Sequence, residues 1–561
     1  MVGATLGWLI GRQIYKEHHD PNLEGSFYGS FYGNPNQERN PASLGSVFVP
    51  LDSWIYPALK RLAALGFIQA QFTGLKPWTR AECKRQTEEA EYAAQNLPPD
   101  SEVVQTIKRL QREFLEDGKY YYSAQIESVY ARYAQISGTP LRDGYHFGQT
   151  LWNDVGRPFD EGANAIAGAA ASAVAGRFFF YVQGEYQHAP GRASLTDAQR
   201  ALIASIDVNP VQPANPVDTI DRFYPIDMYA GAKLGEYSLT FGKQSLWLGP
   251  GEMAPLMLSD NADPMYTLRL SRTTPLLLPG FLRLLGPVCG EIFFSKLSGH
   301  QFPSRPFFNL LKVSLHPTKN LEIGFTRASI WAGVGHPFTP RSLARNLFSV
   351  SESGPEFGDR NDPGDRKSGF DFSYRIPGLR RWLTIYGDMY SDDDPSPLAS
   401  PRRAAVNPGF YVSHLPGISR LDLRGEMTST QMLTSADRGP NFLYFNTQYH
   451  DANTNKGFLF GNATGRDAKS YQGWSTYHFT ATNNLVVSFR ELKISNVFLP
   501  GGGSQTDVSV RFEWQARPNM FIKTFVQRER WLIPALSPTP QKNITGQIQV
   551  TYTPHWRIFK Q

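Results

Sequence analysis

The chain has 561 residues, of which 13% are aromatic and only 19% are charged, and its formal net charge is +6. The charged share is low for a soluble globular protein, and the basic residues form no dense stripe, which argues against a nucleic-acid partner. No apolar run reaches the roughly 18 residues that a spanning helix needs, but a membrane β-barrel leaves only a weak hydropathy trace. Cys83 and Cys289 match no metal or redox spacing, so we expect two free thiols, no metal and no cofactor.

Residues 1–46 are expected to be an N-terminal arm and linker. Residues 2–10 are apolar, but they have neither a basic segment before them nor a clear cleavage site after them. They fit either the remnant of a signal peptide or a disordered arm. Residues 21–46 are rich in Gly, Asn, Pro and Ser, which is typical of a linker.

Residues 47–118 are predicted to form a small helical domain. Three helical patterns follow one another, and each has residues suited to capping before it: Asp52 or Ser53, then Thr79, then Asp100 or Ser101. Glu82 follows Thr79 at the spacing of a capping box. Two interpretations stay open for this domain, a structural bundle and a docking or plugging module.

From residue 119 to residue 561 the hydrophobic period changes from 3.6 to 2. Residues 507–514 show it, because apolar and polar side chains alternate strictly there. Eighteen such segments can be placed, and short connections such as residues 317–319 alternate with long polar ones such as residues 431–469. An even strand number and this asymmetry of connections are typical of bacterial outer-membrane barrels. The predicted fold is therefore an all-β membrane barrel of about 18 antiparallel strands with a small N-terminal α-helical domain, expected to be a monomer. A propeller, one of the soluble alternatives, would repeat every 40–50 residues or so, and no such repeat is seen.

The predicted helical domain of residues 47–118, which we call the head, carries "VPLDSWIYPALKRLAALGFI" and "GLKPWTRAE". The predicted barrel carries "FGKQSLWLGPG", "LMLSDNADP" and "SLHPTKNLEIGFTRASIWAG". In this order the segments resemble the bacterial capsule-assembly family Wzi, over roughly residues 47–554. The resemblance implies an outer-membrane barrel with a periplasmic helical head and extracellular long loops. It implies a lectin-like protein that binds capsular or other surface polysaccharide and helps to assemble or anchor it. Outer-membrane lipid is the other implied partner, and no enzyme activity is implied.

Residues 244–264 are the first candidate for a polysaccharide contact. Gly249-Pro250-Gly251 forces a sharp bend after a predicted strand, because glycine reaches positive φ and proline fixes its own. The loop is expected to fold back into the barrel mouth and to carry Asp260 and Asn261, whose planar polar groups suit sugar hydroxyls, while Trp247 offers a ring face. The alternative is that the loop only constricts the lumen and its polar groups satisfy one another.

Arg327 and Trp331 are the second candidate, on a predicted strand and at its outer end. An arginine at a lumen position could attract an acidic polysaccharide, or it could pair with a lumen carboxylate such as Glu322 or Asp388. Trp331 fits either a sugar contact or the aromatic girdle of a membrane barrel.

Two other function classes stay open. A passive or substrate-selective porin needs an open lumen. A barrel-embedded hydrolase needs two carboxylates about 5–10 Å apart. Nothing in the sequence distinguishes Asp371 and Asp388 as such a pair, so no catalytic residue is assigned.

Overall fold

The computed structural model describes residues 44–336, 338–349, 361–392, 404–431, 442–554 and 556–560. The predicted arm, residues 1–46, lies almost wholly outside these ranges. No helix in the described ranges is long and apolar enough to cross a membrane.

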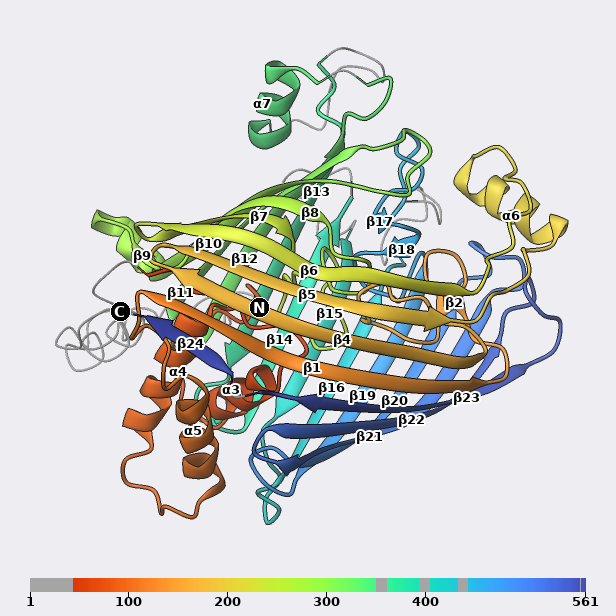
Figure 1. Ribbon diagram of the computed structural model, residues 1–561. Coiled ribbons are helices and arrows are strands. Elements are labelled where there is room, and N and C mark those ends of the chain that lie inside the picture. Colours follow the sequence, from red (N-terminus) through yellow and green to blue (C-terminus); the bar gives the residue numbers. More distant parts are fainter. Residues whose placement is uncertain are drawn as a thin grey trace.

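One antiparallel sheet of twenty strand segments closes on itself (Figure 1). Two segments are short: β9 (Leu276–Leu277) pairs with β10 after β8, and β24 (Arg557–Lys560) pairs with β1 after β23. Within the described chain the wall is thus a barrel of eighteen strands, which confirms the prediction, and β1 pairs with both β4 and β23 to close it. The wall strands are β1 (Tyr122–Ser137), β4 (Gly162–Ala175), β5 (Phe178–Ala189), β6 (Ile220–Leu234), β7 (Tyr237–Lys243), β8 (Tyr266–Arg272), β10 (Pro287–Lys296), β11 (Phe307–Thr318), β12 (Leu321–Trp331), β13 (Asp365–Arg375), β14 (Leu383–Ser391), β15 (Ala404–Val412), β16 (Leu421–Ser429), β19 (Ala468–His478), β20 (Asn484–Ile494), β21 (Gly503–Arg517), β22 (Met520–Leu532) and β23 (Gln541–Tyr552).

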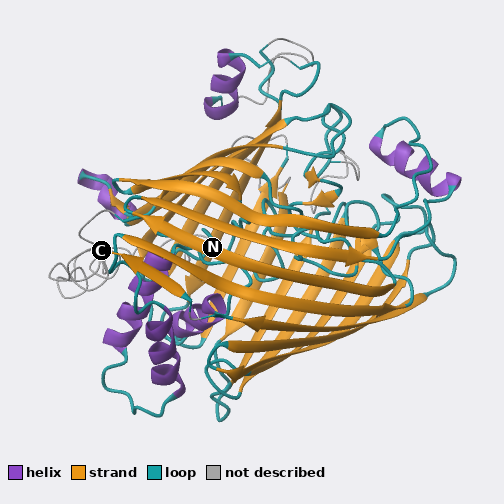
Figure 2. Cartoon of the chain, in the orientation of Figure 1, coloured by secondary structure: helices purple, strands orange, loops and turns teal. Residues whose placement is uncertain are grey.

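The two ends of the barrel differ. At one end, which we call the short-turn end, strands are joined by connections such as residues 235–236 and 518–519, although one connection holds the 3-10 helix η1 (Gly280–Leu285). The opposite, long-loop end carries helices α6 (Asp197–Asp207) and α7 (Pro340–Phe348), as Figure 2 shows. Two small hairpins, β2 (Arg142–Asp143) with β3 (Gly148–Gln149) and β17 (Thr454–Asn455) with β18 (Phe458–Leu459), belong to long connections.

Three helices form the head at the short-turn end: α3 (Ile55–Ala64), α4 (Arg80–Ala93) and α5 (Glu102–Glu113) (Figure 1). They share a buried apolar core that includes Leu59 and Leu110.

The caps of the head helices follow the prediction in two cases of three. Thr79 accepts a hydrogen bond from the backbone N–H of Glu82 at 3.1 Å, and Ser101 caps α5 in the same way. The cap of α3 differs, because Trp54 precedes this helix without a side-chain bond and Ser53 accepts only from Ile55 N–H, at 3.3 Å.

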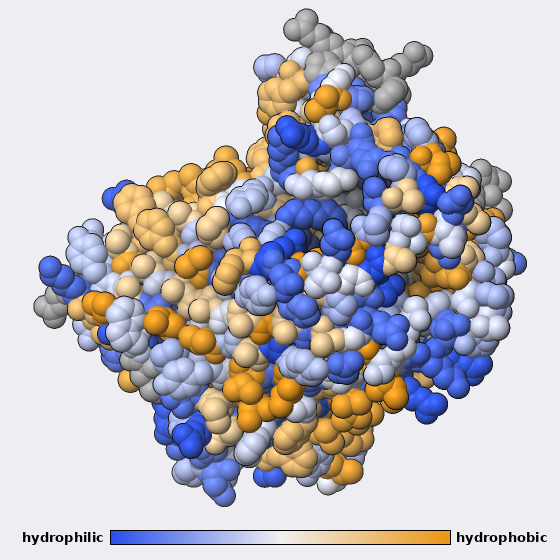
Figure 3. All heavy atoms as spheres, turned by 45° about the vertical axis from the view of Figure 1, so that its right-hand side comes forward, coloured by the Kyte–Doolittle hydropathy of each residue, from blue (hydrophilic) through white to orange (hydrophobic). Residues whose placement is uncertain are grey.

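The outer face of the wall is apolar. On β5, Phe178, Phe180 and Val182 are 52%, 48% and 46% exposed, while Phe179 and Tyr181 between them are buried on the inner face. Other large apolar side chains recur around the outer wall, among them Phe241 on β7, Leu268 on β8, Phe489 on β20, Val508 on β21, Val526 on β22 and Ile548 on β23. Figure 3 shows apolar residues spread over the wall and hydrophilic residues gathered toward the long-loop end. An apolar outer face around a largely polar interior is typical of an outer-membrane barrel.

Candidate functional site

The connection between β7 and β8, residues 244–265, folds into the barrel, and we call it the inner loop. Carboxylates of the wall accept hydrogen bonds from its backbone. Leu256 N–H donates to Asp388 on β14 at 2.6 Å, and the N–H groups of Glu252 and Met253 donate to Glu426 on β16 at 2.6 and 2.8 Å. Buried backbone donors need such partners, so the polar lining of the wall holds a loop in place.

The apolar side chains of the inner loop build a core inside the barrel. Leu256, Met257 and Leu258 are buried in a cluster with Phe308 on β11 and with Phe460 from the connection between β16 and β19. The lumen at this level is therefore packed as a protein interior.

A second segment closes the barrel from the short-turn end. Residues 68–78 of the head, which we call the strap, reach the wall, where the N–H groups of Thr73 and Gly74 donate to Glu322 at 2.8 and 3.0 Å. The strap also meets the inner loop, because Lys76 and Trp247 exchange backbone hydrogen bonds of 3.0 and 3.1 Å. The head thus does more than pack on the barrel, since its strap and the inner loop together form a floor across the lumen.

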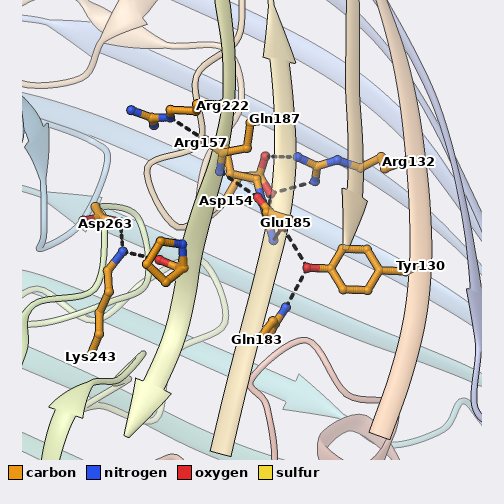
Figure 4. Close-up of polar contacts among 11 residues, drawn as sticks. Tyr130, Arg132, Asp154, Arg157, Gln183, Glu185, Gln187, Arg222, Lys243 and Asp263 are labelled. Carbon is orange, nitrogen blue, oxygen red and sulfur yellow. Dashed lines mark hydrogen bonds and ion pairs between the residues drawn. The ribbon is translucent and has the colours of Figure 1, made fainter. Parts of the chain in front are cut away.

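Above this floor, toward the long-loop end, lies a set of polar side chains that we call the mouth cluster, and Figure 4 shows part of it. Its members come from β1, β5, β6, β7 and three long connections: Arg132, Asp154, Arg157, Glu185, Gln187, Arg222, Tyr224, Lys243, Asp263 and Lys456.

One half of the mouth cluster is a chain of ion pairs between β1 and β5. Arg132 donates to both oxygens of Asp154 at 2.8 and 2.7 Å, and Arg157 donates to Asp154 at 2.8 Å and to Glu185 at 2.8 and 3.0 Å. Burial acts to raise the pKa of Asp154, but the two arginines outweigh it and lower the pKa to about 2. A cavity of about 20 Å³ beside these residues has room for about one water.

The other half surrounds the ring of Tyr224. The cationic groups of Arg222, Lys243 and Lys456 lie 4.3, 4.1 and 4.8 Å from the ring centroid. Asp263 accepts from Lys243 at 2.7 Å and from Lys456 at 2.9 Å.

The mouth cluster carries more positive than negative charge. Five of its residues are cationic and three are acidic. Arg222 is exposed, and the side chain of Lys456 is 46% exposed. These two cations are accessible from the long-loop end, so the cluster can accept an anionic group.

The residues predicted from the inner loop lie beneath the mouth, inside the floor. Trp247 is 8% exposed and its indole N–H donates to Gly251 O at 3.1 Å. Asn261 is fully buried, and its side chain accepts from Asn153 N–H at 3.0 Å and donates to Leu459 O at 2.9 Å. This arrangement matches the alternative in which the loop constricts the lumen and satisfies its own polar groups.

Asp260 differs from its neighbours. Its Oδ1 is buried without a hydrogen-bond partner in the described chain, while its backbone oxygen accepts from Val155 N–H at 2.8 Å. Burial raises the pKa of Asp260 to about 8. The side chain is therefore largely protonated at neutral pH and can donate a hydrogen bond.

The prediction that Arg327 faces the lumen is wrong. On β12 the even-numbered residues Glu322 and Gly324 face the lumen, so the odd-numbered Arg327 faces outward. There it donates to Asn346 O and Ser349 O at the end of α7. A cation at the C-terminus of a helix is stabilised by the unpaired carbonyl groups there, which explains this position.

Trp331 ends β12, as predicted, but it is only 2% exposed. Its ring centroid lies 5.1 Å from that of Phe338, which is 56% exposed. Trp331 and Arg327 are thus on the same outward face, away from Trp247, Asp260 and Asn261.

Residues 131–545 match the family of capsule assembly protein Wzi. The chain belongs to this family. A Klebsiella pneumoniae protein described as an uncharacterized 55.8 kDa protein in the cps region is 27% identical over 183 residues, or 32% of this chain. The chain spans about a third of the length of that relative, 35%.

The fold of this Wzi-family protein is similar to that of Wzi from Escherichia coli, described as an outer membrane protein involved in group 1 capsule assembly and a carbohydrate-binding β-barrel. The TM-score is 0.65 at 17% identity, and the similarity covers 91% of this chain and 100% of the other.

Sequence reasoning missed the mouth cluster of this Wzi-family protein. A signal was available for Arg132 and Arg222, because the adjacent residues Tyr133 and Phe223 are apolar and point outward, being 49% and 86% exposed. Alternation would have placed both arginines on the inner face. For Lys456, in the middle of a long connection, the sequence holds no comparable signal.

Proposed function

We propose that this Wzi-family protein lies in the bacterial outer membrane and binds capsular or other surface polysaccharide at its mouth cluster, helping to assemble or anchor the polymer. The proposed orientation has the long loops outside and the head in the periplasm, because outer-membrane barrels have short turns on the periplasmic side. The descriptions of the K. pneumoniae and E. coli relatives support the link to capsule.

One observation carries the proposal: the described lumen is closed by a floor, and the cationic mouth cluster lies above it. A closed barrel with accessible planar polar groups suits binding better than transport. Guanidinium groups hold carboxylates through paired hydrogen bonds. A repeating polymer can engage many proteins at once, so weak contacts gain by avidity.

The charge of the mouth cluster favours an acidic polysaccharide. The cluster holds two more cations than carboxylates, and its exposed cations, Arg222 and Lys456, can contact an anionic group. We assign Trp247 and Asn261 to the support of the floor. Phe338, which covers Trp331, offers an exposed aromatic face for a second contact.

The test is equilibrium binding of the purified full chain to an acidic polysaccharide from its source bacterium, and to the same polymer after reduction of its carboxyl groups. We expect the acidic polymer to bind more tightly, and the change of Arg222 and Lys456 to Gln to weaken it at least fivefold. Lys296→Gln/Arg305→Gln is the matched control, because it also removes two exposed cations, and neither belongs to the mouth cluster. Equal binding of both polymers, or of the variant and the native protein, would contradict the assignment of the site.

A further inference from the structure

A second group of cations lies on the outside of the barrel. Arg528 and Arg530 on β22 and Lys542 on β23 are exposed, and we call them the outer-wall cluster. They share the parity of Val526 and Ile544, which are each 54% exposed, whereas Gln527 and Glu529 between them are buried on the lumen side. The cluster therefore points away from the mouth.

The three cations are close together. Arg530 and Lys542 are direct partners across the strands β22 and β23, so their Cβ atoms are about 5 Å apart, and Arg528 follows Arg530 on the same face after about 7 Å. None of the three makes an ion pair with a residue in the described ranges. Like charges directly opposite each other destabilise a sheet, so an anion bound between them would be stabilising.

Two lysines extend this positive surface along the same end of the wall. Lys493, the last residue but one of β20, pairs with Glu491 at 2.9 Å, and Lys469, near the start of β19, is its direct cross-strand partner. These lysines flank the cluster but are partly neutralised, since Asp467 also interacts with Lys469.

The outer-wall cluster lies at the upper edge of the apolar belt. Arg530 is two residues from the long-loop end of β22, and Lys542 is the second residue of β23. Toward the short-turn end, the outward residues of β23 become apolar, with Ile544, Ile548 and Val550 at 54%, 45% and 38% exposure. In a membrane this edge is the level of the lipid head groups.

We propose that the outer-wall cluster binds the phosphate groups of a phosphorylated glycolipid in the membrane leaflet at the long-loop end. This inference rests on the proposed outer-membrane location. Paired hydrogen bonds from arginine suit phosphate oxygens, and lysine adds a point charge. The position favours a lipid over the polysaccharide, because the cations adjoin the apolar belt and face away from the mouth cluster.

Native mass spectrometry of the full chain in detergent tests this site with lipid A that carries two phosphates and with the same lipid after dephosphorylation. We expect the phosphorylated form to bind at least tenfold more tightly, and Arg528→Gln/Arg530→Gln to remove that difference. Lys296→Gln/Arg305→Gln, which removes two exposed cations elsewhere at the long-loop end, is the control and should bind like the native protein. Arg528→Lys/Arg530→Lys keeps the charge and should retain part of the preference, which provides a second variant if the first folds poorly.

Two further binding measurements distinguish a lipid phosphate from a free phosphate and from the polysaccharide as the group that the cluster binds. Inorganic pyrophosphate should compete only at millimolar concentration, because it lacks the acyl chains that contact the belt. The acidic polysaccharide should bind the Arg528→Gln/Arg530→Gln variant as it binds the native protein, and a loss there would assign the cluster to the polymer and overturn the inference. Equal binding of both lipid forms would also overturn it while leaving the proposed function intact. If the native protein binds the phosphorylated lipid but not the polysaccharide, the inference is supported and the proposed function is overturned.

Discussion

At the scale of single residues, carboxylates of the wall bind backbone amides of inserted segments. Glu426 and Asp388 accept from the inner loop, and Glu322 accepts from the strap. Each replaces water as the partner of a buried N–H group, which is costly to leave unpaired. Polar residues on the inner face of a barrel therefore need not indicate a water-filled channel.

Glu426 gives a direct test at this scale. Glu426→Ala would leave the N–H groups of Glu252 and Met253 unpaired, together with the hydroxyl of Tyr386 that donates to Glu426 at 2.8 Å. Each buried donor left without a partner costs about 1–3 kcal/mol, so we expect the free energy that holds the inner loop in the lumen to fall by several kcal/mol. Planar-bilayer recordings should then show flickering currents absent from the native protein. Glu491→Ala, on the outer wall, is the control and should show no such currents. If neither variant shows currents, this role of Glu426 is contradicted.

His146 is expected to make the docking of α6 depend on pH. Its ring nitrogens lie 2.7 Å from Asp143 and 2.8 Å from Asp207, which ends α6. Burial acts to lower the pKa of His146, but the two carboxylates outweigh it and raise the pKa to about 9. A raised pKa means that the stabilisation is complete below the ordinary value of about 6.5 and is lost as pH rises through about 9.

Amide hydrogen exchange of residues 197–207, corrected for the intrinsic rate at each pH, measures this effect. We expect the free energy of opening of α6, which these rates give, to fall in the native protein between pH 7 and pH 9.5, by up to about 3 kcal/mol. In His146→Gln, protection should be low at pH 6 as well and should change little with pH. Protection that is constant with pH in the native protein would show that His146 does not hold the helix.

At the scale of elements, the strands and head helices could be predicted because their signals are local. Alternation of apolar and polar residues marks each strand, and side-chain caps such as Thr79 and Ser101 mark helix starts. The first helix shows the limit, because Trp54 occupies its cap position without a side-chain cap bond. Its ring instead stacks on that of Phe521 on β22, with the ring centroids 6.4 Å apart, a tertiary contact that no local pattern reports.

The candidate site could not be predicted in the same way, because it depends on contacts between distant segments. Trp247 and Asn261 occur in a conspicuous motif, yet the motif builds the floor, where strap and wall enclose it. Arg327 was misplaced although its parity with Phe325 and Trp331 marked the outer face. Lys456 joins Tyr224 across more than two hundred residues of chain, which no local pattern reports.

Gly74 tests how closely the strap fits the wall. A Cβ atom at this position would lie 2.7 Å from Asp371 Oδ1 and 3.2 Å from Lys312 Nζ, which form an ion pair of 2.6 Å. Gly74→Val should therefore displace the strap and speed chymotryptic cleavage after Phe72, which is 7% exposed. Gly546→Val is the matched control, because a Cβ atom there meets nothing within 4 Å. Equal cleavage of the two variants would mean that the strap can shift without cost.

At the scale of the whole molecule, the barrel is closed twice, by the strap from one end and by the inner loop from the other. The two segments meet at Lys76 and Trp247. The head is tied to the same place, because Glu252 of the inner loop pairs with Lys60 on α3 at 2.7 Å and with Arg424 on β16. Head, floor and wall therefore form one connected structure, and the mouth cluster rests on it.

Single-channel conductance in a planar bilayer tests this closure for the whole protein. We expect the native chain to carry no steady current, because the described lumen is packed at the floor. Replacing residues 248–262 with a short Gly-Ser linker should allow intermittent current, since the strap still covers the short-turn end. Adding Gly74→Val to that variant should make the current larger and steadier, because both closures are then weakened. A large steady current in the native protein would favour the porin alternative and remove the observation on which the polysaccharide-binding proposal rests.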